Sequence, residues 1–359
     1  MKSILYFMHI DWRWIKQRPH FIAEGLSASA KVDVVHEIMY NSKKQKRTKN
    51  RIANLNIKGI PHIPFCRYDF IFNINSFILN KIILRNKLRK ADVVWFGHPI
   101  HYNKFKSRKG QTIVYDCMDD LLGFSLSERT KERYKRLEAA LCKNADIVLA
   151  SSLNLRNKLK ERYGRNDIYL VNNAISLNLT EDVELPRKIE ECFLDKKTKK
   201  MTYIGTISDW FDFVAMEKIL SENKNLELLL FGPKEVEIPA HERITYCGIL
   251  EHKYILKVMA SSDALVMPFV LNDLILSVDP VKAYEYIYAC KPVIMPRYGE
   301  SEKFEDFIYL YSGVQELQDI ASKLSKGYLE AKRTKEKCKA YAESNSWESR
   351  VKQIKELLK

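Results

Sequence analysis

The sequence predicts an α/β protein with two domains, each built on a parallel β-sheet. Short apolar, β-branched runs alternate with longer stretches that carry apolar residues at helical spacing, and this alternation runs twice along the chain. Most of the short runs lack polar alternation, which is typical of strands buried on both faces of a parallel sheet. The length of 359 residues also favours two domains over a single core.

The predicted elements follow in order along the chain. The expected strands of the first half are Ser3–His9, Val32–His36, Lys58–Phe65, Asp92–Phe96, Thr112–Asp116, Asp146–Ser151 and Ile168–Asn172. Those of the second half are Met201–Gly205, Leu226–Phe231, Ile244–Gly248, Ala264–Pro268, Pro292–Met295 and Phe307–Tyr311. The helical period between them predicts helices at Ser127–Lys143, Ser152–Tyr163, Val214–Glu222, His252–Ser261 and Val281–Ala289.

A charged stretch at Asn178–Lys200, interrupted by Pro186, separates the two halves. We therefore expect one domain over 1–178, a second over 179–340 and a terminal segment over 341–359. The end of that segment, from Trp347 onward, predicts an amphipathic helix. Parallel sheets bind ligands at the carboxyl ends of their strands, so we expect the sheets to face each other across a cleft that holds the active site.

The net charge is strongly positive, at +15 at pH 7. Such an excess predicts an anionic partner, which is either phosphate groups, nucleic acid or an acidic lipid surface. Nucleic acid is not expected as a partner, because the sequence has no helix-turn-helix, zinc-finger, RRM or KH signature.

Cysteine usage and hydropathy bear on the cellular compartment. The seven cysteines include no Cys-x-x-Cys pair, and we interpret them as reduced thiols of a cytoplasmic protein. The apolar start Met1–Ile10 is too short for a secretory signal, and the sequence has no run of about 18 apolar residues that would span a bilayer. Any membrane contact is therefore expected to be peripheral, at the inner face of the membrane.

Two basic stretches have alternative interpretations. Asn41–Arg51 is a charge run that is either a solvated loop or a contact for anionic lipid headgroups. Phe70–Lys90 joins bulky apolar residues to a basic end, as in an interfacial amphipathic helix. The alternatives for Phe70–Lys90 are an ordinary helix with its apolar face in the core, or a surface that receives a lipid-linked acceptor.

The segment Val278–Pro296 carries the most chemical information. Asp279-Pro280 begins a predicted helix, with proline in the first turn. Lys282 and Glu285 are three residues apart and so share one face near the helix start. Free backbone N–H groups and the helix dipole favour a phosphate there. Lys282 would add a full charge, and Glu285 can accept hydrogen bonds from two ribose hydroxyls; a plain surface ion pair is the alternative.

This segment resembles the nucleotide-sugar motif of bacterial GT-B glycosyltransferases, the family 4-like enzymes of capsule, teichuronic-acid and xanthan type polysaccharide synthesis. Their pattern is roughly Ser/Asp-Pro-x-Lys-x-Tyr/Phe-Glu-Tyr-x-Ala-x-Gly-Lys-Pro-Val. The matching residues here are Asp279, Pro280, Lys282, Tyr284, Glu285, Tyr286, Ala289, Lys291, Pro292 and Val293. Cys290 departs from the pattern by replacing the usual Gly, and Ser277 stands where many relatives carry a further Glu.

The resemblance extends over nearly the whole chain. It also includes Trp14–Leu26, Tyr115–Leu121, Tyr203–Phe213 and Trp347-Glu348. It implies the GT-B fold, with two Rossmann-like domains, the first binding the acceptor and the second the donor. It also implies that the helix from Trp347 crosses back to the first domain.

Further candidate residues lie next to predicted strand ends. On the donor side, Gly205-Thr206 would let backbone N–H groups approach a diphosphate, and Tyr246 to Gly248 would form a wall for the base. On the acceptor side, Arg18 could bind a phosphate or acid group, and His20 is either catalytic or a cap on a core contact.

Asp116, Asp119 and Asp120 are clustered after a predicted strand, so one of them can act as a general base. We prefer Asp119, with Asp120 next, because Asp116 falls inside the strand. Loop-capping aspartates are the alternative. If the enzyme inverts, Asp119 takes the acceptor proton; if it retains, Asp119 only positions the acceptor.

The resemblance implies transfer of a sugar from a nucleoside-diphosphate sugar, with UDP preferred, to a hydroxyl of a lipid-linked or polysaccharide acceptor in cell-surface glycan synthesis. No Asp-x-Asp pair lies near a strand end, so we expect neither a metal nor a cofactor beyond the donor. The rival functions are a nucleotide-sugar epimerase on the same fold and a basic, non-enzymatic protein that binds membrane or nucleic acid.

Overall fold

The chain forms two compact units in the computed structural model, which describes residues 1–14, 16–38, 52–61, 65–195 and 197–359. Unit 1 comprises Met1–Asn173 and Trp347–Lys359, and unit 2 comprises Ala174–Ser346. The division between the units therefore lies a few residues before position 178 and a few residues after position 341. The basic run Asn41–Arg51 lies outside the described residues.

Unit 1 contains a seven-stranded sheet in the order β3-β2-β1-β4-β5-β6-β7. Its strands are β1 (Ser3–Met8), β2 (Lys31–Ile38), β3 (Leu55–Pro61), β4 (Val93–Phe96), β5 (Thr112–Cys117), β6 (Ile147–Ala150) and β7 (Ile168–Leu170). Every neighbouring pair is parallel. The chain order reverses between β1 and β4, which is the point where doubly wound sheets bind ligands.

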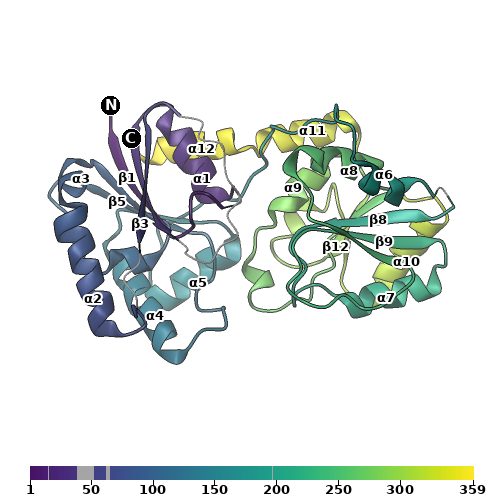
Figure 1. Cartoon of the computed structure of the whole chain (residues 1–359), viewed down its shortest axis with the longest axis horizontal. Coiled ribbons are helices and arrows are strands. Elements are labelled where there is room, and N and C mark those ends of the chain that lie inside the picture. Colours follow the sequence, from purple (N-terminus) through teal and green to yellow (C-terminus); the bar gives the residue numbers. More distant parts are fainter. Residues whose placement is uncertain (15, 39–51, 62–64, 196) are drawn as a thin grey trace. The chain divides into compact units, whose positions relative to one another are not determined.

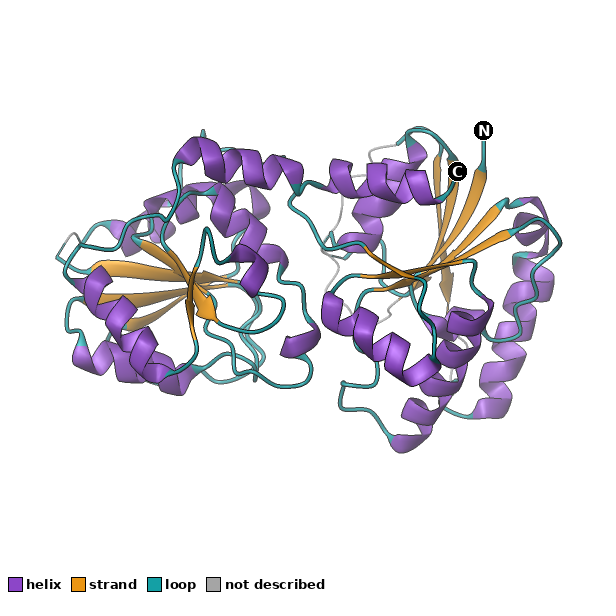
Figure 2. Ribbon diagram, turned by 180° about the vertical axis from the view of Figure 1, so that it is seen from behind, coloured by secondary structure: helices purple, strands orange, loops and turns teal. Residues whose placement is uncertain are grey.

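Helices cover both faces of this sheet, because successive residues of a strand point to opposite sides. Phe7 stacks on Phe96 within a core that includes residues of α4 and α5, whereas Tyr6 stacks on Trp95. Figures 1 and 2 show α1 and α12 together on one face of the sheet. The helical elements are α1 (Arg18–Ser27), α2 (Asp69–Ile78), η1 (Leu79–Ile83), α3 (Arg85–Lys90), η2 (Pro99–Tyr102), α4 (Glu128–Asn144), α5 (Leu153–Tyr163) and α12 (Trp347–Leu357).

The terminal helix α12 packs on α1 within unit 1. The ring of Trp347 stacks on Phe21 with 4.9 Å between centroids. The two helices approach so closely that a Cβ atom built on Gly25 would lie 2.5 Å from Val351 Cγ2. Trp347, Val351 and Ile354 of α12 are buried, so this helix is part of the folded unit 1.

Unit 2 contains a six-stranded sheet in the order β10-β9-β8-β11-β12-β13. Its strands are β8 (Lys199–Ile204), β9 (Leu226–Phe231), β10 (Ile244–Gly248), β11 (Ala264–Val266), β12 (Val293–Pro296) and β13 (Tyr309–Tyr311). All neighbouring pairs are again parallel. This order is the Rossmann order, and its reversal lies between β8 and β11.

The helices of unit 2 also form two layers, with α7 and α10 on one face of the sheet and α8, α9 and α11 on the other (Figure 1). The helical elements are α6 (Arg187–Glu190), η3 (Glu191–Phe193), α7 (Phe213–Glu222), η4 (His252–Tyr254), α8 (Ile255–Ser261), η5 (Ile275–Ser277), α9 (Val281–Tyr288), η6 (Glu302–Phe304), α10 (Val314–Ser325) and α11 (Lys335–Ser344).

Each of the thirteen strands in the described part of the chain overlaps a strand predicted from the sequence. The largest shift is in β3, which begins at Leu55 rather than Lys58. Four α-helices among the described residues were not predicted, namely α1, α6, α10 and α11. In α11 only Cys338 and Ala342 are buried, so the charged sequence shows no clear apolar period.

Candidate functional site

The carboxyl edge of the unit 2 sheet brings together several residues of the predicted donor site. The helix α9 is fixed to this edge by Tyr286, whose hydroxyl accepts a 2.8 Å hydrogen bond from the backbone N–H of Ile204, the last residue of β8. Gly205 follows directly. This hydrogen bond joins α9 to the end of β8, next to the turn that begins at Gly205.

Lys282 and Glu285 form an ion pair at the start of α9. Lys282 Nζ lies 2.6 Å from Glu285 Oε2, and the side chains are 30% and 11% exposed. The preceding residue Pro280 sets an extended backbone conformation before the helix. A partly exposed ammonium group beside the first turn of a helix favours an anion, because the dipole and the lysine act in the same direction.

Asp279 and Tyr284 have a supporting role rather than the direct donor contact expected from the sequence. Asp279 is 1% exposed, and its carboxylate accepts hydrogen bonds from the Tyr284 hydroxyl at 3.3 Å and from Lys303 Nζ at 2.8 Å. Tyr284 is itself buried. Lys303 also pairs with Glu300 at 3.1 Å. This network holds the entry to α9 but does not present either side chain to a ligand.

The turn after β8 depends on glycine at two positions. Gly205 N–H donates to Phe231 O at 2.9 Å, and the Tyr203 hydroxyl donates to Thr206 O at 2.8 Å. Gly232 follows β9 with a φ of +137°, and a Cβ atom built on it would lie 2.0 Å from Gly205 O. Sequence reasoning missed Gly232, although its position directly after a predicted strand was visible.

The end of β10 offers an aromatic ring to solvent. Tyr246 is 37% exposed, and its hydroxyl donates to Gly232 O at 3.0 Å, which fixes the ring beside the glycine turns. Lys234 Nζ lies 5.5 Å from the centre of this ring. Gly248 ends the strand with a φ of +89°. A flat, partly exposed ring at this edge has the geometry needed to stack on a nucleobase.

The two departures from the sequence pattern have clear structural settings. Cys290 follows Ala289, the C-cap residue of α9, and has a φ of +52°, so a residue with a Cβ occupies the left-handed conformation that favours glycine. Ser277 is buried, and its hydroxyl donates to Asp273 O at 3.0 Å.

Arg18 of unit 1 is not available for an acceptor, contrary to the expectation from the sequence. It is 3% exposed, and its guanidinium pairs with Asp116 at 2.8 Å. Another of its nitrogens donates to Val171 O at 2.7 Å. Arg18 thus joins α1 to the ends of β5 and β7, which is a structural role.

Asp120 and His20 are likewise structural. Asp120 is 2% exposed and pairs with both Lys158 and Arg162 at 2.8 Å. Although burial raises its pKa, these two cations outweigh burial, so the pKa lies below the ordinary value and the group is a poor base. His20 is fully buried, and its Nδ1 accepts from Gln17 N at 3.1 Å as part of a helix capping box.

Asp119 differs from Asp120 in the direction of its pKa shift. Its pKa is raised to about 6, mainly by burial; Arg18 lowers the pKa, and the neighbouring carboxylates of Asp116 and Asp120 raise it. A carboxyl group with this pKa is ionised at neutral pH and can still accept a proton effectively. It follows β5, at the carboxyl edge of the unit 1 sheet.

A histidine pair that the sequence analysis did not consider lies at the reversal point of the unit 1 sheet. His9 follows β1 and His98 follows β4, and their ring centroids are 4.9 Å apart. Burial lowers the pKa of His9 to about 4 and that of His98 well below its ordinary value, so both rings are neutral at pH 7. His9 is the last residue of the predicted strand Ser3–His9, and His98 lies two residues after the predicted strand Asp92–Phe96, so their nearness to two strand ends was the available signal.

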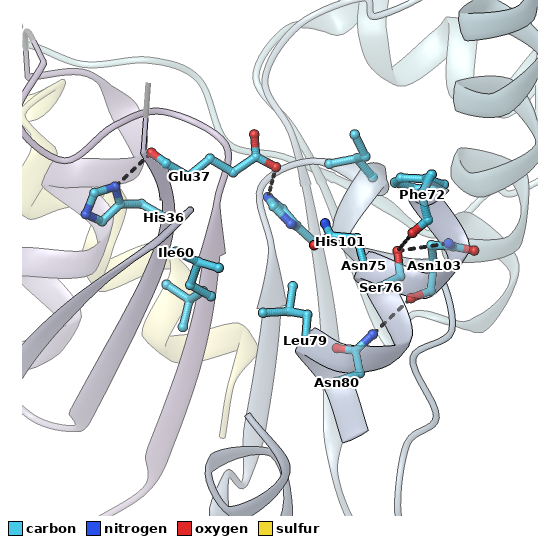
Figure 3. Close-up of a pocket in the computed structure, with 12 residues that line it drawn as sticks. His36, Glu37, Ile60, Phe72, Asn75, Ser76, Leu79, Asn80, His101 and Asn103 are labelled. Carbon is cyan, nitrogen blue, oxygen red and sulfur yellow. Dashed lines mark hydrogen bonds and ion pairs between the residues drawn. The ribbon is translucent and has the colours of Figure 1, made fainter. Parts of the chain in front are cut away.

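Figure 3 shows a pocket of unit 1 between β2, η2 and the inner side of α2. Its interior volume is about 30 Å³, which holds a water molecule but not a sugar ring. Asn80 donates to Asn103 O at 2.9 Å, while its Oδ1 has no protein hydrogen-bond partner among the described residues. This pocket fits a solvent site better than a substrate site.

No cluster of three or more His, Cys, Asp or Glu side chains with the arrangement of a metal site occurs among the residues that the structure describes. The candidate donor site of unit 2 is instead built from backbone amides, one lysine, one glutamate and an aromatic ring.

Comparison with known proteins gives one match of sequence. No protein-family model matches the chain. Over 216 residues it is 22% identical to a protein of Bacillus subtilis (strain 168) described as a teichuronic acid biosynthesis glycosyltransferase. The match covers 55% of this chain and 54% of that protein, so the chain matches about half the length of this relative.

Solved structures resemble the chain over its whole length. Sucrose-phosphate synthase from Thermosynechococcus elongatus has a TM-score of 0.74 at 13% identity, covering 100% of this chain and 98% of that one. The Anabaena protein HepE, solved in complex with UDP-glucose, has a TM-score of 0.70 at 14% identity, covering 100% and 99%. Together with the strand orders of its two parallel sheets, this similarity shows that the chain has the GT-B fold, made of two Rossmann-like domains.

Proposed function

We propose that the chain is a glycosyltransferase that moves a sugar from a nucleoside-diphosphate sugar, with UDP as the nucleotide, to an acceptor hydroxyl. The observation that carries the proposal is the Lys282–Glu285 pair at the start of α9, next to the glycine turn after β8. Two comparisons support it: the Bacillus subtilis relative is described as a glycosyltransferase, and the HepE structure holds UDP-glucose.

In this proposal unit 2 binds the nucleotide. Lys282 and the N–H groups at the start of α9 hold the diphosphate, and the Gly205 turn lets the backbone approach it. Glu285 accepts hydrogen bonds from the ribose hydroxyls, and Tyr246 stacks on the base. The departing nucleoside diphosphate is an anion, so the same lysine and amides would also stabilise the charge that develops as the sugar leaves.

Unit 1 would bind the acceptor. We assign Asp119 to the acceptor hydroxyl, either as the base that takes its proton or as the group that positions it. If Asp119 is the base, the rate of transfer falls as the pH drops below about 6, where this carboxyl becomes protonated. Asp119→Asn would then lower kcat and abolish that pH dependence.

The acceptor we propose is a lipid-linked or polysaccharide glycan of the cell surface. The support comes from the relative that is described as a teichuronic acid biosynthesis glycosyltransferase and from the strongly basic composition of the chain. Such an acceptor would place the reaction at the inner face of a membrane.

The decisive experiment is calorimetric titration of Lys282→Ala with UDP and with UDP-sugars. A charged hydrogen bond contributes about 1.5–3 kcal/mol, so we expect UDP affinity to fall about 10- to 100-fold. Lys218→Ala, at an exposed lysine of unit 2, is the matched control and should bind normally. Unchanged affinity in the Lys282 variant would refute the proposal, and conversion of the donor without any acceptor would favour an epimerase instead.

A further inference from the structure

One side of the segment from α2 to α3 packs into the core of unit 1. Phe72, Ser76, Asn80 and Leu84 are buried at intervals of four residues. In a regular α-helix this spacing drifts by about 40° per step. The π-helical turn η1, in which Leu84 N–H donates to Leu79 O, corrects that drift and keeps the row directed at the core. Figure 3 shows the inner side of α2 lining the small pocket.

The opposite side of the same segment exposes bulky apolar side chains. Phe70 is 76% exposed, Phe77 is 53% and Ile82 is 66%. Of the 22 large apolar side chains that are exposed in the described residues, seven lie in this short stretch: Phe65, Tyr68, Phe70, Ile74, Phe77, Ile82 and Ile83. Singly scattered apolar residues need no explanation, but a concentration of this kind marks an interaction surface.

Basic side chains accompany these apolar residues. From Phe65 to Lys90 the sequence has six basic residues and one acidic residue, Asp69. Asp69 is paired with Arg129 and Arg133 of α4, which leaves the segment itself strongly positive. We define the apolar–basic face as the exposed side chains Phe70, Ile74, Phe77, Lys81, Ile82, Ile83, Arg85, Arg89 and Lys90.

We propose that the apolar–basic face docks on the surface of an anionic lipid bilayer. Aromatic and branched side chains that enter the headgroup boundary, with lysine and arginine beside them, are the composition that such a surface binds. A second copy of the chain would place like charges against each other, which disfavours self-association through this face. None of the helices in the described part of the chain is long and apolar enough to cross the bilayer. The contact that we propose lies in the plane of the bilayer surface.

The proposed function places the reaction at a membrane; this inference adds the surface that would contact the bilayer, and it stands on residues other than those of the donor site. The donor residues belong to unit 2, whereas the apolar–basic face belongs to unit 1. Loss of membrane binding should therefore leave UDP affinity intact, and loss of UDP affinity should leave membrane binding intact.

The test is co-flotation of the purified full chain with vesicles of phosphatidylcholine containing about 30% phosphatidylglycerol, a content of the order that generates a strong negative surface potential. We expect binding to these vesicles, weak binding to pure phosphatidylcholine, and release as the salt concentration is raised. Lys81→Gln with Arg85→Gln should weaken binding about 25-fold, since each basic residue near the surface contributes about fivefold. Phe70→Ser with Phe77→Ser should weaken it by about tenfold or more.

Matched double variants in unit 2 control for nonspecific effects. Val214→Ser with Tyr328→Ser removes two apolar side chains that are each 79% exposed, and Lys218→Gln with Lys224→Gln removes two exposed charges. These controls should float like the wild type. Equal binding to neutral and anionic vesicles, wild-type binding by both unit 1 variants, or equal losses in the controls would overturn the proposal. Thermal melts and UDP titration verify that each variant is folded.

Discussion

Lys282 Nζ lies 2.6 Å from Glu285 Oε2, so the two residues that the sequence motif separates by one helical turn are in direct contact on one side of α9. The contact keeps the lysine beside the helix start instead of extended into solvent. It also means that a ligand would meet a cation and a carboxylate together, which suits a molecule with a phosphate at one end and hydroxyl groups at the other.

The first prediction separates the roles of these two residues. Lys282→Ala should weaken binding of both UDP and pyrophosphate, because both present a diphosphate. Glu285→Ala should weaken UDP by about 10-fold or more, from loss of hydrogen bonds to the ribose, and should leave pyrophosphate binding equal or tighter. Calorimetry with the two ligands measures the difference. Parallel losses of both ligands in both variants would show that Glu285 only supports the lysine.

The second prediction concerns stability and Asp119. Its pKa is about 6 in the folded protein and about 3.9 in an unfolded chain, so between these values the folded state binds more protons. Stability therefore falls as pH rises through this window. Asp119→Asn should be more stable than the wild type by about 1–3 kcal/mol at pH 7.5, and this advantage should shrink towards pH 4.

Urea unfolding at several pH values measures the effect of Asp119→Asn. Asp209→Asn, at an exposed side chain of unit 2, controls for the loss of one negative charge. A stabilisation that does not depend on pH would contradict the raised pKa of Asp119.

The third prediction tests the buried Arg18–Asp116 pair. Arg18→Met leaves the Asp116 carboxylate buried without its cation, so we expect a loss of about 3–5 kcal/mol in the free energy of unfolding. Combining it with Asp116→Asn should recover part of that loss, because the uncompensated charge is gone. Arg187→Met, which removes an exposed arginine paired with Glu191, should change stability by less than about 0.5 kcal/mol. If Arg18→Met abolished acceptor binding without destabilising the fold, Arg18 would be a binding residue after all.

The fourth prediction concerns the end of α9. Cys290 has a φ of +52°, and a left-handed conformation costs a residue with a Cβ about 1 kcal/mol relative to glycine. Cys290→Gly should therefore raise the unfolding free energy of unit 2 by about 0.5–1 kcal/mol. Cys290→Ala removes the same thiol but keeps the Cβ, and it should give no gain. Equal effects of the two changes would assign the result to the thiol and not to the backbone.

Most of the strands could be predicted because they are short apolar runs buried on both faces, a property that is visible locally. The strands β3 and β10 are exceptions, since most of their described side chains are exposed or partly exposed. β9 and β10 have the predicted bounds. The Lys282–Glu285 contact was also predictable, because the two residues are three positions apart on one helix. The role of Arg18 was not, because its partner Asp116 is 98 residues away, and only the folded sheet shows that both side chains are buried.

The contact between Gly232 and Gly205 could not be predicted from the sequence either, because it is formed only in the folded sheet. This contact gives the last prediction. Its φ of +137° suits glycine, and a Cβ would lie 2.0 Å from Gly205 O, a backbone atom that cannot move without disturbing the turn after β8. Gly232→Ala should therefore destabilise unit 2 by at least about 2–3 kcal/mol and weaken UDP binding, because the displaced turn lies beside the proposed diphosphate site. Gly299→Ala is the matched control, since a Cβ there meets no atom within 4 Å, and it should be nearly neutral. Thermal unfolding and UDP titration of both variants decide the matter: a Gly232 variant that melts and binds UDP like the Gly299 variant would show that the close approach of these two turns has no role in the donor site.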